Sequence, residues 1–338
     1  MYGILVAAVV AALITAALTP GVRKWAVKIG AVDHPSARRI NTVPMPRIGG
    51  VAICLGFIIA VVLTVTVRQF SREGQHTWSW QVVGVLVAVL FAGAVGLVDD
   101  RKDLSPKLQV LCMAAAGLIL VSFGVRIEGI TNPLGGSIGL QYNPLVNWHP
   151  LSVVTSVALT VLWVFTVTKT IDAIDGVDGL AAGVCAISAG TLALMATLLH
   201  TQDGPTLALM AAAVTGACLG FLRYNYNPAK IIMGTVGAWV LGVALAALSI
   251  LGAFKVAAAV SVLVPVLVLG VPLFDYTHVI TRRILDRAPL TKADKRHLHH
   301  RLLALGWNQR QVVWFIYSVT VVLCLMAFAI FQYGRVAH

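Results

Sequence analysis

The sequence predicts an all-α polytopic membrane protein with about ten transmembrane helices. Hydrophobic residues make up 59% of the 338 residues and charged residues only 11%, whereas an average soluble domain carries about 25% charged residues. Apolar runs long enough to cross the hydrocarbon core recur along the whole chain. Because lipid solvates an apolar exterior, this composition suits a bilayer and excludes an ordinary soluble domain.

Ten apolar segments reach, or nearly reach, the length needed to span a bilayer. They are expected at about 3–20, 48–68, 81–98, 108–124, 151–168, 179–199, 205–222, 236–253, 256–274 and 312–331. No Lys or Arg precedes the first segment, so we expect a spanning helix there rather than a cleaved signal peptide. The sequence has no internal repeat or linker, which predicts one membrane-embedded domain over 1–338.

The distribution of Lys and Arg predicts the orientation of these helices. All of them except Arg68, Arg72, Arg126, Lys255 and Arg335 fall in or beside the odd-numbered loops. The positive-inside rule therefore predicts five cytoplasmic loops and both termini outside. This asymmetry explains the net charge of +12, so we do not expect nucleic-acid binding.

The acidic residues gather on the same predicted cytoplasmic side. All 13 except Glu73, Glu128 and Asp203 lie in or beside the odd-numbered loops. Helix orientation depends on Lys and Arg and hardly on acids. The acidic cluster therefore needs another cause, which predicts that the five cytoplasmic loops form a site. Among the outer loops, about 125–150 alternates apolar and polar residues around Gly135–Gly136 and is predicted to form a β-hairpin.

Two cytoplasmic loops carry clustered carboxylates. Asp99 and Asp100 are adjacent at a predicted helix end, where neighbouring residues point about 100° apart, so one would act while the other orients. Asp172, Asp175 and Asp178 recur every three residues and would repel one another on a helix unless a cation or substrate donors relieve the repulsion. Capping of the next helix would explain Asp178 alone.

Basic and polar side chains on the other three loops suit phosphate groups. Arg47 is either a phosphate ligand or ordinary inside-positive charge. The Tyr/Asn loop around Asn225 precedes a Gly-x-x-Gly turn, which is a weak nucleotide-binding signal. His297, His300 and Arg301 share one helical face, which suits a pyrophosphate. A zinc site and a solvated basic face are the alternatives for that face.

Together these loops resemble one family, the polyprenyl-phosphate N-acetylhexosamine-1-phosphate transferases, from about 33 to 306. The resemblance rests on five motifs in order: Pro46-Arg47-x-Gly-Gly, Gly96-x-x-Asp-Asp-Arg with Ser105-Pro-Lys, Asp175-Gly-x-Asp-Gly-Leu-Ala, Phe221-Leu-x-Tyr-Asn-x-x-Pro-Ala-Lys and His297-x-His-His-Arg-Leu. The His-x-His-His form and the first loop look like the branch that uses UDP-N-acetylglucosamine (UDP-GlcNAc).

The resemblance implies transfer of GlcNAc-1-phosphate from UDP-GlcNAc to undecaprenyl phosphate with release of UMP, the first membrane step of a teichoic acid, O-antigen or similar glycan. It implies Mg²⁺, or Mn²⁺ in its place, and a bacterial plasma membrane location among membrane lipids, with a cytoplasmic site. A homodimer is a family expectation only. The alternatives are a UDP-MurNAc-pentapeptide phosphotransferase and a degenerate homologue that binds nucleotide or lipid without turnover. A transporter is disfavoured because the predicted spans have no charged residue near their centres.

The resemblance also implies roles for individual residues. The catalytic residues would be Asp99, Asp100, Lys107, His297, His299, His300 and Arg301. The substrate-binding residues would be Arg47, Asp175, Asp178 and Asn225.

The chain departs from the family pattern at three positions. Thr235 stands where the family has a metal-ligating Asp, and Lys169 and Asp172 stand where it has two Asn. One carboxylate is lost and another appears, so Asp172 is predicted to supply the metal ligand, with Thr235 as a weaker one. Alternatively, Lys169 takes over part of the role of the cation.

Overall fold

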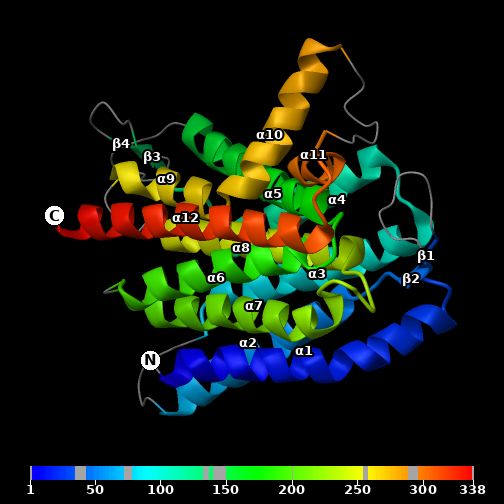
Figure 1. The fold of residues 1–338 in the computed structure, drawn as a ribbon. Helices are drawn as coiled ribbons and strands as arrows, with labels where there is room; N and C mark the ends of the chain where they lie inside the picture. The colour runs from blue at the N-terminus through cyan, green and yellow to red at the C-terminus, as the bar shows by residue number, and fades with distance from the viewer. Residues whose placement is uncertain are drawn as a thin grey trace.

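Helices make up most of the described chain, as the sequence predicts. The computed structural model describes residues 2–34, 43–71, 78–131, 137–139, 150–199, 201–253, 258–287 and 296–336. Its helices are α1 (Tyr2–Lys28), α2 (Gly50–Ser71), α3 (Trp80–Lys102), α4 (Pro106–Ser122), α5 (Pro150–Ile174), α6 (Leu180–Thr197), α7 (Gly204–Asn225), α8 (Gly234–Ala253), α9 (Ala258–Val268), α10 (Gly270–Leu285), α11 (Leu298–Ala304) and α12 (Gln309–Val336). Most of them run side by side as one bundle (Figure 1).

The protein is a multi-pass membrane protein. Within the described ranges, eight helices are long and apolar enough to cross a membrane, namely α1, α2, α3, α5, α6, α7, α8 and α12. The predicted span at 108–124 corresponds to the shorter apolar helix α4. Each of the ten predicted apolar segments therefore contains helix, and the number of actual crossings stays a prediction.

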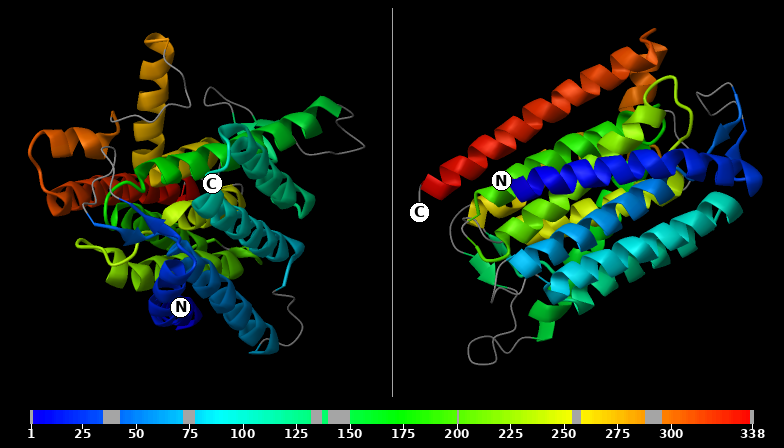
Figure 2. Two further views of the ribbon diagram at one scale, coloured as in Figure 1. Left: turned by 90° about the vertical axis from the view of Figure 1, so that its right-hand side faces the viewer. Right: turned by 90° about the horizontal axis from the view of Figure 1, so that it is seen from below.

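The ninth predicted segment differs from one continuous span. It breaks after Val268, and α10 continues far beyond the predicted end at 274. Pro265 lies inside α9, and Pro272 lies in the first turn of α10. Proline lacks the N–H of the helical ladder and clashes with the preceding turn, which favours a break between these positions. Figures 1 and 2 show α10 rising steeply out of the bundle.

Helix α8 is the centre of the bundle, and nearly all of its residues are buried. It packs against α3 and α5 most closely, and also against α2, α6 and α7. These neighbours cover α8 on nearly every side, so little of it is left to face lipid. Its N-terminal residue, Gly234, therefore lies where the ends of several neighbouring helices meet.

Two short hairpins complete the fold. β3 (Gly129–Thr131) pairs antiparallel with β4 (Ser137–Gly139), which confirms the predicted hairpin, although its turn at Gly135–Gly136 lies outside the described residues. β1 (Val32–Asp33) pairs with β2 (Met45–Pro46), which the sequence analysis did not predict. These strands are too short for any periodic pattern to reveal them.

Both termini lie at one end of the bundle, and the ends of α3 and α5 that carry the clustered carboxylates lie at the other (Figures 1 and 2). This arrangement agrees with an even number of crossings. The side of the membrane on which each end lies stays a prediction.

Cysteine labelling tests the predicted orientation. Lys102, the last residue of α3, and Gln202, just before α7, are both exposed. The end of α3 and the start of α7 lie at opposite ends of the bundle (Figure 1). In intact cells, we expect a membrane-impermeant maleimide to label Gln202→Cys and to leave Lys102→Cys unlabelled until the cells are permeabilised. The reverse pattern would place the carboxylate end outside. Wild-type protein controls for the native cysteines, of which all but Cys112 are buried.

Candidate active site

A buried carboxylate caps the first turn of α8. The two oxygens of Asp100, at the end of α3, accept hydrogen bonds from the backbone N–H of Thr235 (2.9 Å) and Val236 (3.0 Å). A helix N-terminus carries unpaired N–H groups and a partial positive charge, so it stabilises a carboxylate. Gly234 has a φ of +72°, and a Cβ there would lie 2.5 Å from Asp100 Oδ2. Both the backbone conformation and the close carboxylate therefore require glycine at this turn.

Arg47 joins the first loop to this cap. Its Nε lies 2.7 Å from Asp100 Oδ1, and its Nη2 donates to the Thr235 hydroxyl over 3.4 Å. The backbone places Arg47 here, because Ile232 N–H donates to Pro46 O in β2. Asp100, Arg47 and Thr235, which the sequence predicted as site residues, are thus in direct contact. Through these contacts Asp100 positions α8 and Arg47, and its predicted catalytic role stays a prediction.

Asp99 faces a different set of partners, as expected for neighbouring helical residues. It is buried and accepts hydrogen bonds from Leu104 N–H (3.1 Å) and Gln109 Nε2 (2.8 Å). The Oε1 of Gln109 in turn accepts a hydrogen bond from Lys169 Nζ over 2.9 Å. Lys169 Nζ also lies 3.1 Å from Asp172 Oδ2. A continuous chain of polar contacts therefore runs from α3 through α4 to the end of α5.

Gln109 is a site residue that the sequence analysis missed. It lies in the first turn of α4, where its amide bridges Asp99 and Lys169. A lone glutamine in an apolar helix carries no motif signal. Only its polarity within an apolar segment could have drawn attention to it.

Asp175 lies among the charges of both clusters. Burial raises the pKa of Asp175 well above its usual value, and the nearby carboxylates of Asp172 and Asp100 raise it further. The Arg47 guanidinium and a hydrogen bond from Gly234 act in the opposite direction. The neutral form of Asp175 is thus favoured to a higher pH than for an ordinary aspartate.

Asp178 and Asn225 fasten the loop after α5 to the loop after α7. Asp178 Oδ2 accepts hydrogen bonds from Asn227 Nδ2 and Ala229 N–H, both over 3.0 Å. Asn225 Oδ1 accepts a hydrogen bond from Gly179 N–H over 3.1 Å, and Asn225 Nδ2 donates to the carbonyl oxygen of Ile231 over 3.0 Å. The expected capping of α6 by Asp178 is wrong, because the N-cap residue is Gly179 and, within the described chain, no side chain bonds to the first turn of the helix. The Asp178 carboxylate accepts hydrogen bonds from the loop after α7 instead.

The histidines are organised by Asp275 on α10, a second residue that the sequence analysis did not include in the site. Its Oδ2 lies 2.9 Å from His297 Nδ1, and its Oδ1 accepts the Leu298 N–H at the start of α11 over 2.6 Å. Asp275 is buried. This pairing leaves Nε2 as the ring nitrogen of His297 for other partners. The break before α10 brings Asp275 to this position, so no motif in the sequence could reveal the pair.

His299 points inward, although the family resemblance implies that it is one of the catalytic residues. It is buried, and burial lowers its pKa to about 3, with the neighbouring His300 adding to the effect. The ring is therefore neutral near pH 7. A Cβ on Gly176 would lie 2.8 Å from His299 Nε2, so the missing side chain at 176 lets α11 dock on the Asp175–Asp178 turn. His300 is half-buried, and Arg301 and Lys107 are exposed.

Comparison with known proteins assigns the chain to a family. Residues 82–253, which include Asp99, Asp175 and Asn225, match the sequence model described as Glycosyl transferase family 4. The chain is also 37% identical over 328 residues to a relative in Bacillus subtilis (strain 168), an alignment that covers 97% of this chain and 85% of the relative. The chain belongs to glycosyl transferase family 4.

The relatives of this family 4 chain carry related names. The Bacillus subtilis protein is named a probable undecaprenyl-phosphate N-acetylglucosaminyl 1-phosphate transferase. A decaprenyl-phosphate N-acetylglucosaminephosphotransferase of Mycobacterium tuberculosis (strain ATCC 25618 / H37Rv) is 35% identical over 323 residues, covering 91% of this chain and 77% of the relative. A phospho-N-acetylmuramoyl-pentapeptide-transferase of Caldicellulosiruptor bescii is 30% identical over 292 residues, covering 82% of each chain.

The family 4 site does not fit a preformed metal centre. Among the residues that the structure describes, no three His, Cys, Asp or Glu side chains are grouped so that they could hold a metal ion. The two predicted ligands each contact a cation of the chain itself. Asp172 pairs with Lys169, and the Thr235 hydroxyl accepts a hydrogen bond from Arg47.

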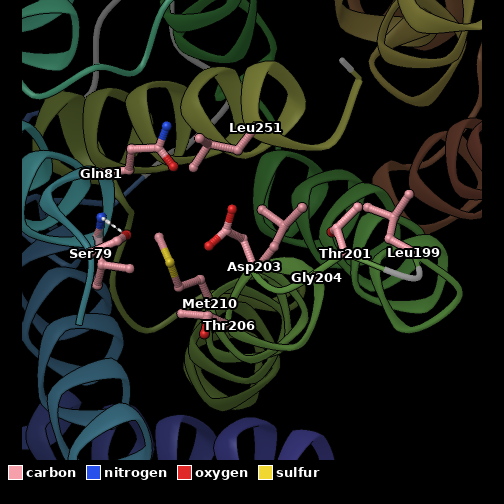
Figure 3. Close-up of a pocket in the computed structure, with 11 residues that line it drawn as sticks. Ser79, Gln81, Leu199, Thr201, Asp203, Gly204, Thr206, Met210 and Leu251 are labelled. Carbon is pink, nitrogen blue, oxygen red and sulfur yellow. Dashed lines mark hydrogen bonds between the residues drawn. The ribbon is translucent and has the colours of Figure 1, made fainter. Parts of the chain in front are cut away.

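A separate pocket lies at the opposite end of the family 4 bundle (Figure 3). Its lining includes Ser79, Gln81, Asp203, Thr206 and Met210. Ser79 caps the N-terminus of α3, and the 23 residues of that helix separate it from the carboxylate end. At 1.5 Å per residue this is a distance of roughly 35 Å, so this pocket does not belong to the site.

A methyl group at Gly176 tests the docking of α11. Gly176→Ala should displace His299 and lower kcat/KM at least about tenfold, because small displacements of a positioned group cost large factors in rate. Gly190→Ala on α6 is the matched control, since its Cβ would meet only ordinary contacts at 3.7 Å. Steady-state UMP release measures both. Equal activity of the two variants would contradict the inferred docking.

The Asp275–His297 pair gives a second test. Asp275→Asn keeps the shape but removes the charge that orients His297, so we expect kcat to fall about tenfold or more. The control is Asp286→Asn, which breaks an exposed ion pair with Arg296. Exposed pairs contribute little, so this control should keep its activity and its thermal midpoint. A normal kcat in Asp275→Asn would show that the pair has no role in turnover.

Proposed function

We propose that the protein transfers GlcNAc-1-phosphate from UDP-GlcNAc to undecaprenyl phosphate and releases UMP. The observation that carries this proposal is the meeting of three of the five family motifs at one place, where Arg47, Asp100 and Asp175 lie at the N-terminus of α8. The name of the Bacillus subtilis relative, 37% identical along 97% of the chain, supports the choice of sugar and lipid.

The reaction is a phosphoryl transfer between two anions. An oxygen of the lipid phosphate attacks the β-phosphorus of the nucleotide sugar, and the bond from that phosphorus to the bridging oxygen breaks. UMP leaves, and GlcNAc-1-phosphate remains joined to the lipid as a diphosphate. Such chemistry depends on positioning and on positive charge near the phosphates. Arg47 and Lys169 supply fixed positive charge at the site, with the exposed Lys107 at the start of α4 available to the acceptor.

The remaining predicted residues have assignable tasks in this scheme. Asp99 and Asp100 hold Gln109 and Arg47 in place. Asp178 and Asn225 shape the loop that would face the nucleotide. The exposed Arg301 and the half-buried His300, at the edge of the same region, would contact the diphosphate. The proposal includes a bacterial plasma membrane location with this end in the cytoplasm, where nucleotide sugars are made. A homodimer stays a family expectation.

Magnesium stays a prediction from the family resemblance. A divalent ion supplies charge neutralisation at a diphosphate when bound. The described side chains do not form a preformed site for it, and the steps above rely on residues of the chain alone.

An assay of UMP release tests the proposal. Purified full-length protein in lipid nanodiscs should release UMP from UDP-GlcNAc only when undecaprenyl phosphate is present, in equal amounts with the glycolipid product. UDP-MurNAc-pentapeptide, suggested by the more distant relative in Caldicellulosiruptor bescii, should give at least tenfold less UMP. Preference for that donor would favour the alternative substrate. No UMP from any donor, with or without Mg²⁺, would support a homologue without turnover.

A further inference from the structure

Lys169 is an ionisable residue near the end of a spanning helix. It lies five residues before the end of α5, and its side chain is only 18% exposed. A charged side chain in a membrane helix is costly and normally marks a functional site. The contacts of Lys169 therefore need an explanation beyond topology.

The ammonium group is held from two sides. Asp172 Oδ2 lies 3.1 Å away and Gln109 Oε1 lies 2.9 Å away. An ammonium has three N–H donors, so within the described chain one donor remains for a ligand. Asp172, with 30% of its side chain exposed, gives the cluster access to solvent. The cation is thus restrained but not enclosed.

A further residue, Asp99, fixes the orientation of the Gln109 amide that holds Lys169. Asp99 accepts the Nε2 hydrogen bond of Gln109 over 2.8 Å, which sets the orientation of the amide so that its oxygen faces Lys169. Asp99 is therefore a positioning residue for the ammonium. A pre-oriented cation binds an anion without a further ordering cost, as a catalytic site requires.

An unpaired donor belongs to the same region. The Lys169 ammonium lies 5.9 Å from the ring centroid of Trp239, which is 2% exposed. The indole N–H of Trp239 has no hydrogen-bond partner among the described residues. Buried donors are costly when left unpaired. An anionic oxygen is a suitable acceptor for either donor.

Other cations and polar groups surround this position. Arg47 and Asp172, the partner of Lys169, both act on the Asp175 carboxyl, so Asp175 lies near both ion pairs. From α10, Tyr276 lies close enough to Lys169, Asp172 and Arg283 for their charges to act on its hydroxyl. Positive charge therefore enters the cluster from three separate elements, the first loop, α5 and α10.

We propose that Lys169 is the built-in cation of this site and that its ammonium binds a substrate phosphate without a protein-bound divalent ion. The ligand chemistry is a phosphate oxygen, which either the donor diphosphate or the lipid phosphate can supply. The inference rests on the proposed function, because that function defines the two phosphate substrates. It makes Asp172 the partner of an ammonium rather than a metal ligand.

Binding measurements in EDTA test this inference. Isothermal titration of UDP-GlcNAc into the full-length protein, and separately of undecaprenyl phosphate into nanodiscs, should give wild-type binding that EDTA leaves unchanged. Lys169→Met should weaken one of these two ligands at least tenfold, and the affected ligand identifies the phosphate that Lys169 binds. Lys102→Met, at an exposed position at the end of α3, should leave both affinities unchanged. Wild-type protein should also show no Mn²⁺ bound tightly by electron paramagnetic resonance.

Asp172→Asn separates the two interpretations of Asp172, and it keeps the experiment informative if Lys169→Met fails to fold. If Asp172 is the partner of Lys169, Asp172→Asn should preserve phosphate binding in EDTA. If Asp172 is a metal ligand, Asp172→Asn should abolish metal-dependent binding. Abolition of wild-type binding by EDTA, or tight Mn²⁺ binding lost in Asp172→Asn, would overturn the inference. Wild type that binds neither substrate under any condition would instead refute the proposed function.

Discussion

The carboxylate of Asp100 at the N-terminus of α8 is the contact on which the arrangement of the site depends. It satisfies two backbone N–H groups of the central helix and pairs with Arg47 from the first loop. Three segments far apart in the chain are joined by this one group. Breaking a buried ion pair by removing one partner typically costs about 3–5 kcal/mol. The interaction therefore fixes both where α8 begins and where the first loop lies.

A second set of constraints brings the last part of the chain to the same place. The ninth apolar segment breaks near its prolines, and α10 leaves the bundle at a steep angle (Figure 2). This direction allows Asp275 to hold His297 and the start of α11. His299 then packs on Gly176, where no side chain interferes. The histidines are thus anchored from α10 and from the loop after α5 at once.

Charge balance gives the site its chemical character. Asp99, Asp100, Asp172 and Asp175 would repel one another if each were isolated. Arg47 and Lys169 reduce this repulsion from within the chain, and Gln109 transmits the effect of Asp99 to Lys169. The same cations that stabilise the carboxylate cluster are suited to phosphates. Stability of the fold and binding of anionic substrates therefore depend on the same few side chains.

The sequence by itself determined the fold class, the apolar segments and the gathering of carboxylates, because hydrophobic run length and loop charge are local properties. It also predicted the hairpin at 125–150, and among the candidate site residues it named Arg47, Asp100 and Asp175, which lie together in the structure. Only the tertiary structure decided the partners. Gln109 and Asp275 carry no motif, the direction of Asp178 depends on a loop fifty residues away, and the inward turn of His299 depends on Gly176. Such pairings arise from contacts between distant segments, and a single sequence does not encode distance in any local pattern.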